Sequence, residues 1–535
     1  MSLNRLWTFL AVALPVLAAL LASLSSVDLA YHLRAGEEIV RTGAIPRVDN
    51  WTFTANGLPW LDQQWGSQII LSAVYQVGGW TGLALLRAGL VGMVFGAVLL
   101  IGLRRGLAPR NAAFVTLGAF AVAAPALALR PQLLGMACFA ILLVLVSERR
   151  CHPAGLWAIP FLVLVWANLH GSFFLAPVVL GLAWLEDVAE RQAGAHRTLL
   201  IALVSVATAC VTPFGPAVWR YAVGLSTNPE VASRITEWQP TTIRDGTGIL
   251  FFISLAAVVT LMARSSRTVP WAILAWIGVF AAIGLYAQRG LAWWSLAGAV
   301  AVIRLLPRRA DAPEPETPPT LRRLNVAVAA ILVLAGIALL PMWRPPDAGT
   351  GVPVGVLTDA PPGVTAALRT AARSGDHVFN PQPWGSWFEF ALPDLKSGLD
   401  SRIEFFPADV WEDYERVVAG AAGWEERLAT WNVAIVVVQA ADEAFRDRLV
   451  AAGWSELYRD PDGAILRAPT TQGRASVQTR FSGPGRSPSA VLVDRRWRPN
   501  GIVHDQAGVG AVRHGPHHGR QPSQQHREPV DVHDR

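Results

Sequence analysis

The chain has 535 residues, of which 52% are hydrophobic and only 16% are charged. Soluble globular proteins carry about 25% charged residues, so this composition excludes an ordinary soluble protein. The net charge of +6 comes mainly from arginines in short stretches between apolar runs. This distribution favours membrane orientation over nucleic-acid binding. The three cysteines show neither metal-ligand spacing nor a disulfide framework.

Apolar runs long enough to cross a bilayer recur along the first two-thirds of the chain. The first run resembles a signal peptide but lacks a clear cleavage site before Asp28, so we interpret it as a retained helix. We therefore predict a polytopic α-helical membrane protein with about eleven transmembrane helices. They are expected near residues 6–26, 83–103, 112–129, 133–147, 155–169, 173–185, 198–213, 247–263, 269–287, 290–306 and 324–342.

Connections rich in arginine alternate with connections that carry other polar residues. The positive-inside rule assigns the arginine-rich side to the cytoplasm, together with the N-terminus. The other side of the membrane then faces away from the cytoplasm, and it carries the segments that are rich in polar residues. It comprises the opening loop, the turns at 130–132, 168–171 and 288–290, the loop 214–246 and everything after Pro341.

We expect three parts along the chain. A transmembrane domain, 1–343, includes a first extracytoplasmic loop, 27–68, and a C-terminal extracytoplasmic α/β domain covers 344–469. Alternating helical and β-branched segments support that second domain, with NVAIVVVQ as a core strand. An acidic linker precedes the last span. From residue 470 onward the periodicity is lost, which predicts a disordered tail.

The first loop combines acids with tryptophans. Its segment 29–43 suits a short amphipathic helix on the membrane surface, and Asp28 precedes this helix as an N-cap would. Two interpretations of Asp28 follow. It caps the helix, or it acts as a catalytic acid or base at the mouth of a cavity, and one residue can do both. Trp60 and Trp65 suit either interfacial anchors or surfaces that stack on sugar rings.

The order of residues in this loop is distinctive. Asp28 follows the first span, a Tyr-His pair comes one turn later, and the patterns GxxIxxxGxIPxxD and GxPWxD follow before the second span. This order resembles the first extracytoplasmic loop of the GT-C superfamily of membrane glycosyltransferases. It is most similar to bacterial relatives of the protein O-mannosyltransferases and of the aminoarabinose transferases of lipid A. The chain has Leu29 where the family often has Glu, and it lacks the family's Lys-Pro-Pro element.

The resemblance implies a function and a location. The family moves a sugar from a polyprenyl-phosphate carrier, here to an envelope glycan, lipid or protein acceptor outside a bacterial inner (plasma) membrane. Asp28 matches the family's catalytic aspartate, which would deprotonate the acceptor hydroxyl. Asp62 would assist acceptor binding or ligate a divalent metal ion, and no other cofactor is implied. The partners are the lipid-linked donor, the acceptor and membrane lipids, with no nucleic acid.

Outward-facing polar residues are the candidates for substrate binding. A guanidinium fork suits the departing phosphate, although Arg130 and Arg289 fit equally well as side chains that snorkel at helix ends. His170 suits an interfacial hydrogen bond better than catalysis, and Glu237 lies in a second predicted surface helix that closes the cavity. The candidate set comprises His32, Trp60, Trp65, Arg130, His170, Arg234, Glu237, Arg244 and Arg289.

Two other functions stay open. A transporter or flippase of lipid-linked intermediates would show inverted repeats and acids near mid-membrane, and neither is visible in the sequence. A non-catalytic GT-C-like scaffold that binds envelope partners is compatible with every pattern described. The glycosyltransferase is the leading hypothesis.

Overall fold

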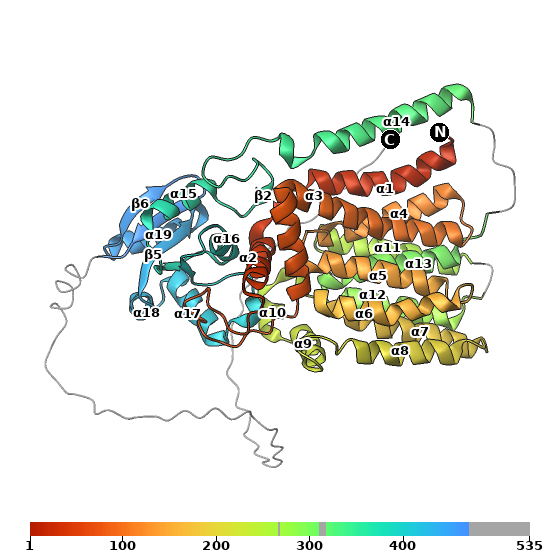
Figure 1. Ribbon diagram of the computed structural model, residues 1–535, viewed down its shortest axis with the longest axis horizontal. Coiled ribbons are helices and arrows are strands. Elements are labelled where there is room, and N and C mark those ends of the chain that lie inside the picture. Colours follow the sequence, from red (N-terminus) through yellow and green to blue (C-terminus); the bar gives the residue numbers. More distant parts are fainter. Residues whose placement is uncertain (266–267, 310–316, 470–535) are drawn as a thin grey trace, which may run out of the picture. The chain divides into compact units, whose positions relative to one another are not determined.

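The structure, a computed structural model, describes residues 1–265, 268–309 and 317–469. A mainly helical region comes first, and a region with a five-stranded sheet follows it (Figure 1). The predicted tail from residue 470 and most of the predicted acidic linker at 312–319 lie outside the described residues.

The apolar runs form helices that lie side by side (Figure 1). Helices suit such segments because their backbone hydrogen bonds are satisfied internally, as hydrocarbon requires. Each predicted span overlaps one of these helices. They are α1 (Leu3–Leu21), α3 (Trp65–Arg104), α4 (Pro109–Ala123), α5 (Pro131–Ser147), α6 (Ala158–Leu169), α7 (Leu175–Ala189), α8 (Ala195–Thr208), α11 (Gly246–Ala263), α12 (Trp271–Tyr286), α13 (Leu291–Leu305) and α14 (Pro319–Ala338).

Several of these helices are candidates to span a membrane. In the described part of the chain, five helical segments are long and apolar enough to do so, and four shorter ones are also apolar. A mostly helical body with several candidate spanning helices is therefore confirmed, while the total of about eleven spans stays a prediction. The five are Leu3–Leu21, Trp65–Arg104, Gly171–Ala189, Gly246–Ala263 and Pro319–Ala338.

Shorter helical segments lie between the long helices and within the sheet region. The predicted surface helix in the loop 214–246 is divided into α9, α10 and η4. These segments are α2 (Ser26–Thr42), α9 (Ala217–Ser226), α10 (Pro229–Arg234) and the 3₁₀ turns η1 (Ala124–Ala126), η2 (Pro153–Trp157), η3 (Gly171–Phe174), η4 (Thr236–Trp238), η5 (Gln288–Gly290), η6 (Pro341–Trp343), η7 (Ile403–Phe405) and η8 (Ala440–Asp442).

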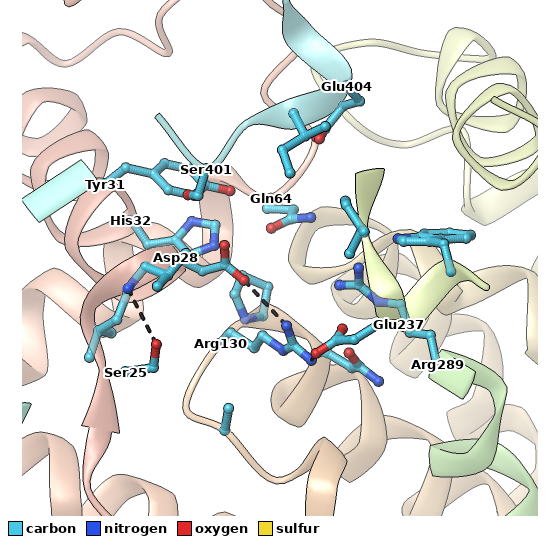
Figure 2. A pocket seen from close by; sticks show the side chains of 18 of the residues that line it. Ser25, Asp28, Tyr31, His32, Gln64, Arg130, Glu237, Arg289, Ser401 and Glu404 are labelled. Carbon is cyan, nitrogen blue, oxygen red and sulfur yellow. Dashed lines mark hydrogen bonds and ion pairs between the residues drawn. The ribbon is translucent and has the colours of Figure 1, made fainter. Parts of the chain in front are cut away.

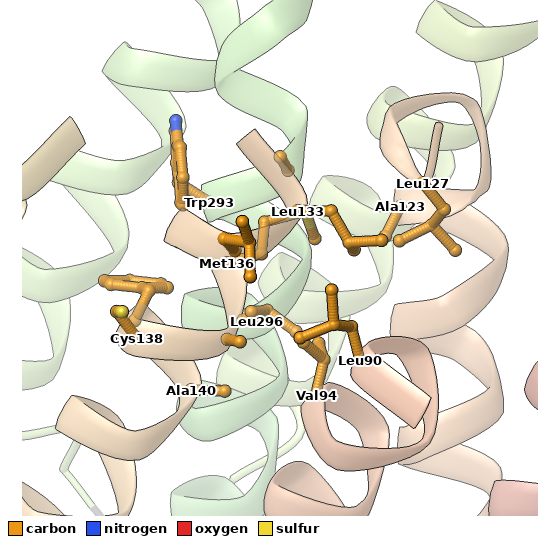
Figure 3. Close-up of a cluster of buried hydrophobic side chains, with 14 of the residues drawn as sticks. Leu90, Val94, Ala123, Leu127, Leu133, Met136, Cys138, Ala140, Trp293 and Leu296 are labelled. Atoms are coloured by element: carbon orange, nitrogen blue, oxygen red, sulfur yellow. The ribbon is translucent and has the colours of Figure 1, made fainter. Parts of the chain in front are cut away.

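Helix α5 lies in the middle of the helical core. Figure 3 shows its Leu133 and Met136 among side chains of α3 and α13, including Leu90 and Leu296. The ring of Phe139 packs against three neighbouring aromatic rings, with 5.5–6.3 Å between the ring centres. Because a packed core tolerates little movement, this burial fixes the position of α5 and of the residues at both of its ends.

Helix α3 breaks at Gly79, whose φ of 54° and ψ of −149° lie outside the helical region. Residues that have a side chain rarely adopt these backbone angles, whereas glycine adopts them easily because it has no Cβ atom. The segment before the break packs closely on α2, where a Cβ at Gly36 would lie 2.1 Å from the Gln68 carbonyl oxygen. Helix α2 and the segment of α3 before the break are thus packed tightly against each other.

The C-terminal region is a mixed sheet of order β4-β3-β5-β7-β6 with helices around it. The predicted core strand NVAIVVVQ forms its centre, parallel to β3 and antiparallel to β7, and β6 pairs with β7 in antiparallel orientation at the edge of the sheet. The elements are β3 (His377–Phe379), β4 (Lys396–Ser397), β5 (Val433–Gln439), β6 (Ser455–Arg459), β7 (Gly463–Arg467), α15 (Pro362–Ala371), α16 (Gln382–Ala391), α17 (Ala408–Ala419), α18 (Trp424–Thr430) and α19 (Glu443–Ala451).

The sheet region contacts the start of the helical region directly. β1 (Leu24–Ser25), just before α2, pairs in parallel with β2 (Leu357–Thr358). Thr52 bridges to Ser397 of β4, and the buried Arg402 donates to Asp49 at 2.7 Å. Residues that follow α1 and residues that precede or belong to the sheet therefore form one end of the molecule together.

Candidate active site

A cavity of about 440 Å³ lies at this end, between the helical region and the sheet region. Its wall comes from α2, the residues at the start of α5, the α10–η4 segment, η5 and residues 401–404. Figure 2 shows Asp28, Arg130, Glu237 and Arg289 around it, with Glu404 on the sheet side. Acids and bases from distant segments thus meet around one space.

Asp28 lies in the first turn of α2 and is not its cap. Ser25 is the N-cap, and its Oγ accepts a hydrogen bond from the Val27 backbone N–H at 3.4 Å. The prediction that Asp28 caps this helix is therefore wrong, because the helix begins at Ser26, three residues earlier than the amphipathic pattern indicates. A first-turn carboxylate is still favoured by the helix dipole, and this one borders the cavity.

Arg130 joins two carboxylates across the cavity wall. Its Nη1 lies 3.3 Å from Asp28 Oδ2, and its Nη2 donates to both Glu237 oxygens at 2.6 and 2.7 Å. The backbone of Arg130 is extended, as a following proline favours, which turns the side chain away from α5. Glu237 has both oxygens engaged, whereas Asp28 has one long contact and keeps lone pairs for a proton.

Arg289 lies where this cavity meets a second, apolar one. The second cavity has a volume of about 590 Å³ and is lined by aromatic and aliphatic side chains such as Trp219, Ile283 and Trp293. Arg289 and His170 line both spaces. The Arg289 guanidinium lies 5.3 Å from the Trp238 ring centre and has no hydrogen bond or ion pair with the described residues. A cation is therefore available at the junction of a polar and an apolar space.

The two histidines of the cavity are both held neutral or nearly so by their surroundings. Burial, reinforced by the charge of Arg130, lowers the pKa of His32 to about 3. His170 Nδ1 accepts from the Ser172 backbone N–H at 3.2 Å and lies 2.7 Å from its Oγ. Because Nδ1 accepts, the proton of the neutral ring lies on Nε2. The hydrogen-bonding interpretation of His170 agrees with this geometry.

Four predicted residues lie outside both cavities. Asp62 is buried beside Gln68, whose amide donates to its Oδ1 at 2.8 Å, and burial raises the pKa of Asp62 to about 7. Trp65 donates to Asn168 at 3.0 Å. Trp60 packs edge-on against Trp51, and Arg244 lies in the loop before α11. These positions reflect packing within the loops, which residue type alone does not predict.

Several cavity residues were not among the sequence candidates. Gln132 comes two residues after Arg130, at the start of an apolar span. Glu404 belongs to η7 of the sheet region. Tyr221 donates to Glu404 at 3.3 Å, and burial raises the pKa of this carboxyl. Gln132 lies in an apolar run and Glu404 in the segment GLDSRIEFF, so neither carries a local pattern that marks it as part of a site.

Arg402 explains why Glu404 reaches the cavity. Its guanidinium donates to Asp49 at 2.7 Å and, through Nε, to Asp400 at 2.9 Å. The rings of Trp51, Trp60 and Phe405 surround it at 4.6–4.9 Å. These contacts hold the segment that carries Ser401 and Glu404 against the first loop.

The residues present do not fit the divalent metal ion considered from the sequence. Among the described residues, no group of three or more His, Cys, Asp or Glu side chains could hold a metal ion. Asp28 and Glu237 both face Arg130, whose positive charge opposes a nearby cation. Asp62 is bonded to Gln68 away from them.

Comparison with solved structures identifies the fold. The oligosaccharyltransferase AglB from Archaeoglobus fulgidus, in complex with an inhibitory peptide and a dolichol-phosphate, matches with a TM-score of 0.54 and 12% identity over 88% of this chain and 75% of that chain. The apo form of the Archaeoglobus fulgidus oligosaccharyltransferase matches with a TM-score of 0.52 and 12% identity over 81% and 69%. ArnT from Cupriavidus metallidurans, bound to undecaprenyl phosphate, has a TM-score of 0.48 and 16% identity over 86% and 98%.

No protein-family model and no curated protein matches the sequence. The solved structures nevertheless match over most of the chain, across both the helical and the sheet region. The chain therefore has the fold of the AglB structures, in agreement with the resemblance of its first loop to the GT-C superfamily.

Proposed function

We propose that this protein is a glycosyltransferase that takes a sugar from a polyprenyl-phosphate carrier. The observation that carries this proposal is the position of Arg289 between the charged cavity and the apolar one. A polyprenyl phosphate has an apolar chain and an anionic head, so its chain suits the apolar cavity and its phosphate suits Arg289. The dolichol-phosphate bound to AglB supports this class of ligand.

In this proposal Asp28 is the general base. Its carboxylate accepts the proton of the acceptor hydroxyl while the acceptor oxygen bonds to the anomeric carbon of the sugar. The bond from that carbon to the phosphate oxygen breaks, and the polyprenyl phosphate leaves with the electron pair. Arg289 stabilises the charge that develops on the leaving phosphate. Arg130 orients Asp28 and is itself anchored by Glu237.

The acceptor approaches from the sheet side of the cavity, where Gln382, Ser401 and Glu404 form the wall. It is a hydroxyl-bearing envelope glycan, lipid or protein. We expect this end to lie outside the cytoplasm at a bacterial inner membrane, because the positive-inside rule assigns the arginine-rich connections and the N-terminus to the cytoplasm. The other end of the helices carries the arginine-rich connections.

A charge inside an apolar helix would favour a transporter, and Arg87 of α3 is buried in this way. Its guanidinium donates to the backbone carbonyl of Ser23 at 2.8 Å and to those of Ala19 and Ala22. These carbonyls end α1 and have no helical partners of their own. Arg87 thus acts as a cap for α1, and it supports the fold rather than transport.

The experiment is transfer from a radiolabelled polyprenyl-phosphate sugar by the purified full-length protein. Asp28→Asn removes the base and is expected to lower the rate by about 10²–10⁴-fold, with unchanged elution in detergent and unchanged binding of polyprenyl phosphate. Glu190→Gln is the matched control, because Glu190 pairs with Arg150 at the far ends of α5 and α7. Full transfer by the Asp28→Asn variant would remove Asp28 from this role.

A further inference from the structure

One part of the cavity wall carries two polar side chains with buried atoms that have no hydrogen-bond partner among the described residues. His32 is 2% exposed and Gln132 is 1% exposed, and both line the cavity. Neither the amide nitrogen nor the amide oxygen of Gln132 has a hydrogen-bond partner among the described residues, and the same holds for His32 Nδ1. A buried polar group without a partner costs about 1–3 kcal/mol, so three such atoms beside one cavity indicate a ligand that supplies their partners.

The charges around these atoms disfavour a cationic ligand. The positive charge of Arg130 contributes to the low pKa of His32, and the same field opposes any other cation at that position. Each of the three carboxylates that line the cavity already has at least one partner. Asp28 and Glu237 face Arg130, and Glu404 accepts from Tyr221.

The chemistry of the two side chains matches hydroxyl groups. An amide offers two donors and an acceptor, and a neutral imidazole offers one donor and one acceptor. A sugar hydroxyl donates once and accepts twice, so adjacent hydroxyls can satisfy both side chains. His32 also lies on the same helix as Asp28, one turn further on, which places it beside the proposed base (Figure 2).

We propose that His32 and Gln132 bind the hydroxyl groups of the transferred sugar, and that the donor carries an uncharged sugar rather than a protonated amino sugar. This inference rests on the proposed function, because it assigns the sugar of a lipid-linked donor to the polar cavity. It adds the class of sugar and two residues that select it.

The test compares three lipids by their dissociation constants, measured from the tryptophan fluorescence of the full-length protein in detergent. They are a short polyprenyl phosphate, the same lipid carrying an uncharged hexose, and the same lipid carrying an amino sugar. We expect the hexose to improve binding by about tenfold, the effect of two hydrogen bonds, and the amino sugar to give no improvement.

Two variants assign the effect to these side chains. Gln132→Leu and His32→Phe keep similar volumes, and each is expected to reduce the gain from the hexose while leaving the affinity for the bare lipid phosphate unchanged. Gln132→Leu should also unfold at a higher temperature without ligand, because it removes unpartnered polar atoms. Gln76→Leu is the control, since Gln76 is exposed on α3 and lines neither cavity.

The outcomes separate this inference from the proposed function. Tighter binding of the amino-sugar lipid than of the hexose lipid would overturn the class of sugar. A hexose gain that survives in both variants would overturn the assignment of the two residues. In both cases the binding of the bare lipid phosphate would leave the proposed function standing. A protein that binds none of the three lipids would overturn the proposed function, and this inference with it.

Discussion

Helix α5 has a charged cluster at each end, and the two clusters differ in how completely their charges are paired. At its start, Arg130 contacts Asp28 and Glu237 beside a cavity of about 440 Å³. Two residues beyond its last turn, Arg149 contacts Glu186 at 2.7 Å and Asp187 at 2.9 Å. The space around that second cluster is only about 20 Å³, roughly the room for one water molecule.

The second cluster is closed by additional partners. Arg304 pairs with Glu186, and Arg150 pairs with Asp187 at 3.0 Å. The hydroxyl of Thr198 also donates to Asp187 at 3.0 Å. Four helix ends, those of α5, α7, α8 and α13, are held together in this way. Residue types at the two ends are similar, so the difference lies in free volume and in unpartnered atoms, and these mark the end that can bind a ligand.

Breaking the closed cluster should have the largest effect on stability. Arg149→Met leaves two buried carboxylates short of a partner and is expected to lower the free energy of unfolding by about 3–5 kcal/mol. The readout is thermal unfolding in detergent. Arg150→Met is the control, because the Arg150 side chain is 37% exposed, and pairs of that kind contribute about 1 kcal/mol or less. Equal stability of the two variants would show that the cluster is not structural.

At the open end, Arg289→Gln should change binding and not stability. Its guanidinium has no hydrogen bond or ion pair with the described residues, so removing the charge leaves no buried acid unpaired. Loss of a charged hydrogen bond to phosphate is expected to weaken binding of a polyprenyl phosphate by about 10–100-fold. Arg323→Gln, at the exposed start of α14, should bind normally. If the Arg289→Gln variant binds the polyprenyl phosphate as tightly as the unchanged protein, Arg289 does not bind the phosphate.

Asp62 belongs to neither cluster, and its effect is spread over several pH units. Its pKa is raised from 3.8 to about 7 by burial, so the folded protein keeps a proton that the unfolded chain has released. Stability should therefore fall as the pH rises from 4 to 7, with a slope on the order of 1 kcal/mol per pH unit. Asp62→Asn should lack this decline in thermal unfolding curves recorded at successive pH values. Parallel curves for the two proteins would contradict the raised pKa.

The sequence predicts the part of this molecule that depends on local pattern and alternation. Apolar runs predict the helices, and counting them places the turns at Arg130, His170 and Arg289 at the same end as Asp28. The structure brings these four residues to one cavity. Such convergence is predictable because antiparallel neighbours expose alternate connections at the same end.

Other features depend on tertiary contacts that the sequence does not encode locally. Trp60 looks like a sugar-stacking ring, but it packs on Arg402 at 4.6 Å. Gln132 is one polar residue at the start of an apolar run, and whether it faces the cavity depends on the rotation of α5. Glu404 lies in the site because Arg402 pairs with Asp49, which is 353 residues earlier in the chain.

That pairing has a consequence for the order in which the protein is made. Asp28, Arg130, Glu237 and Arg289 are all synthesised before the segment that contains Ser401 and Glu404. The cavity therefore lacks one wall until the ribosome has passed residue 404 and Arg402 has docked on the first loop. Only a nascent chain that has reached this stage contains all the residues of the site, so activity would begin only after residue 404 has been synthesised.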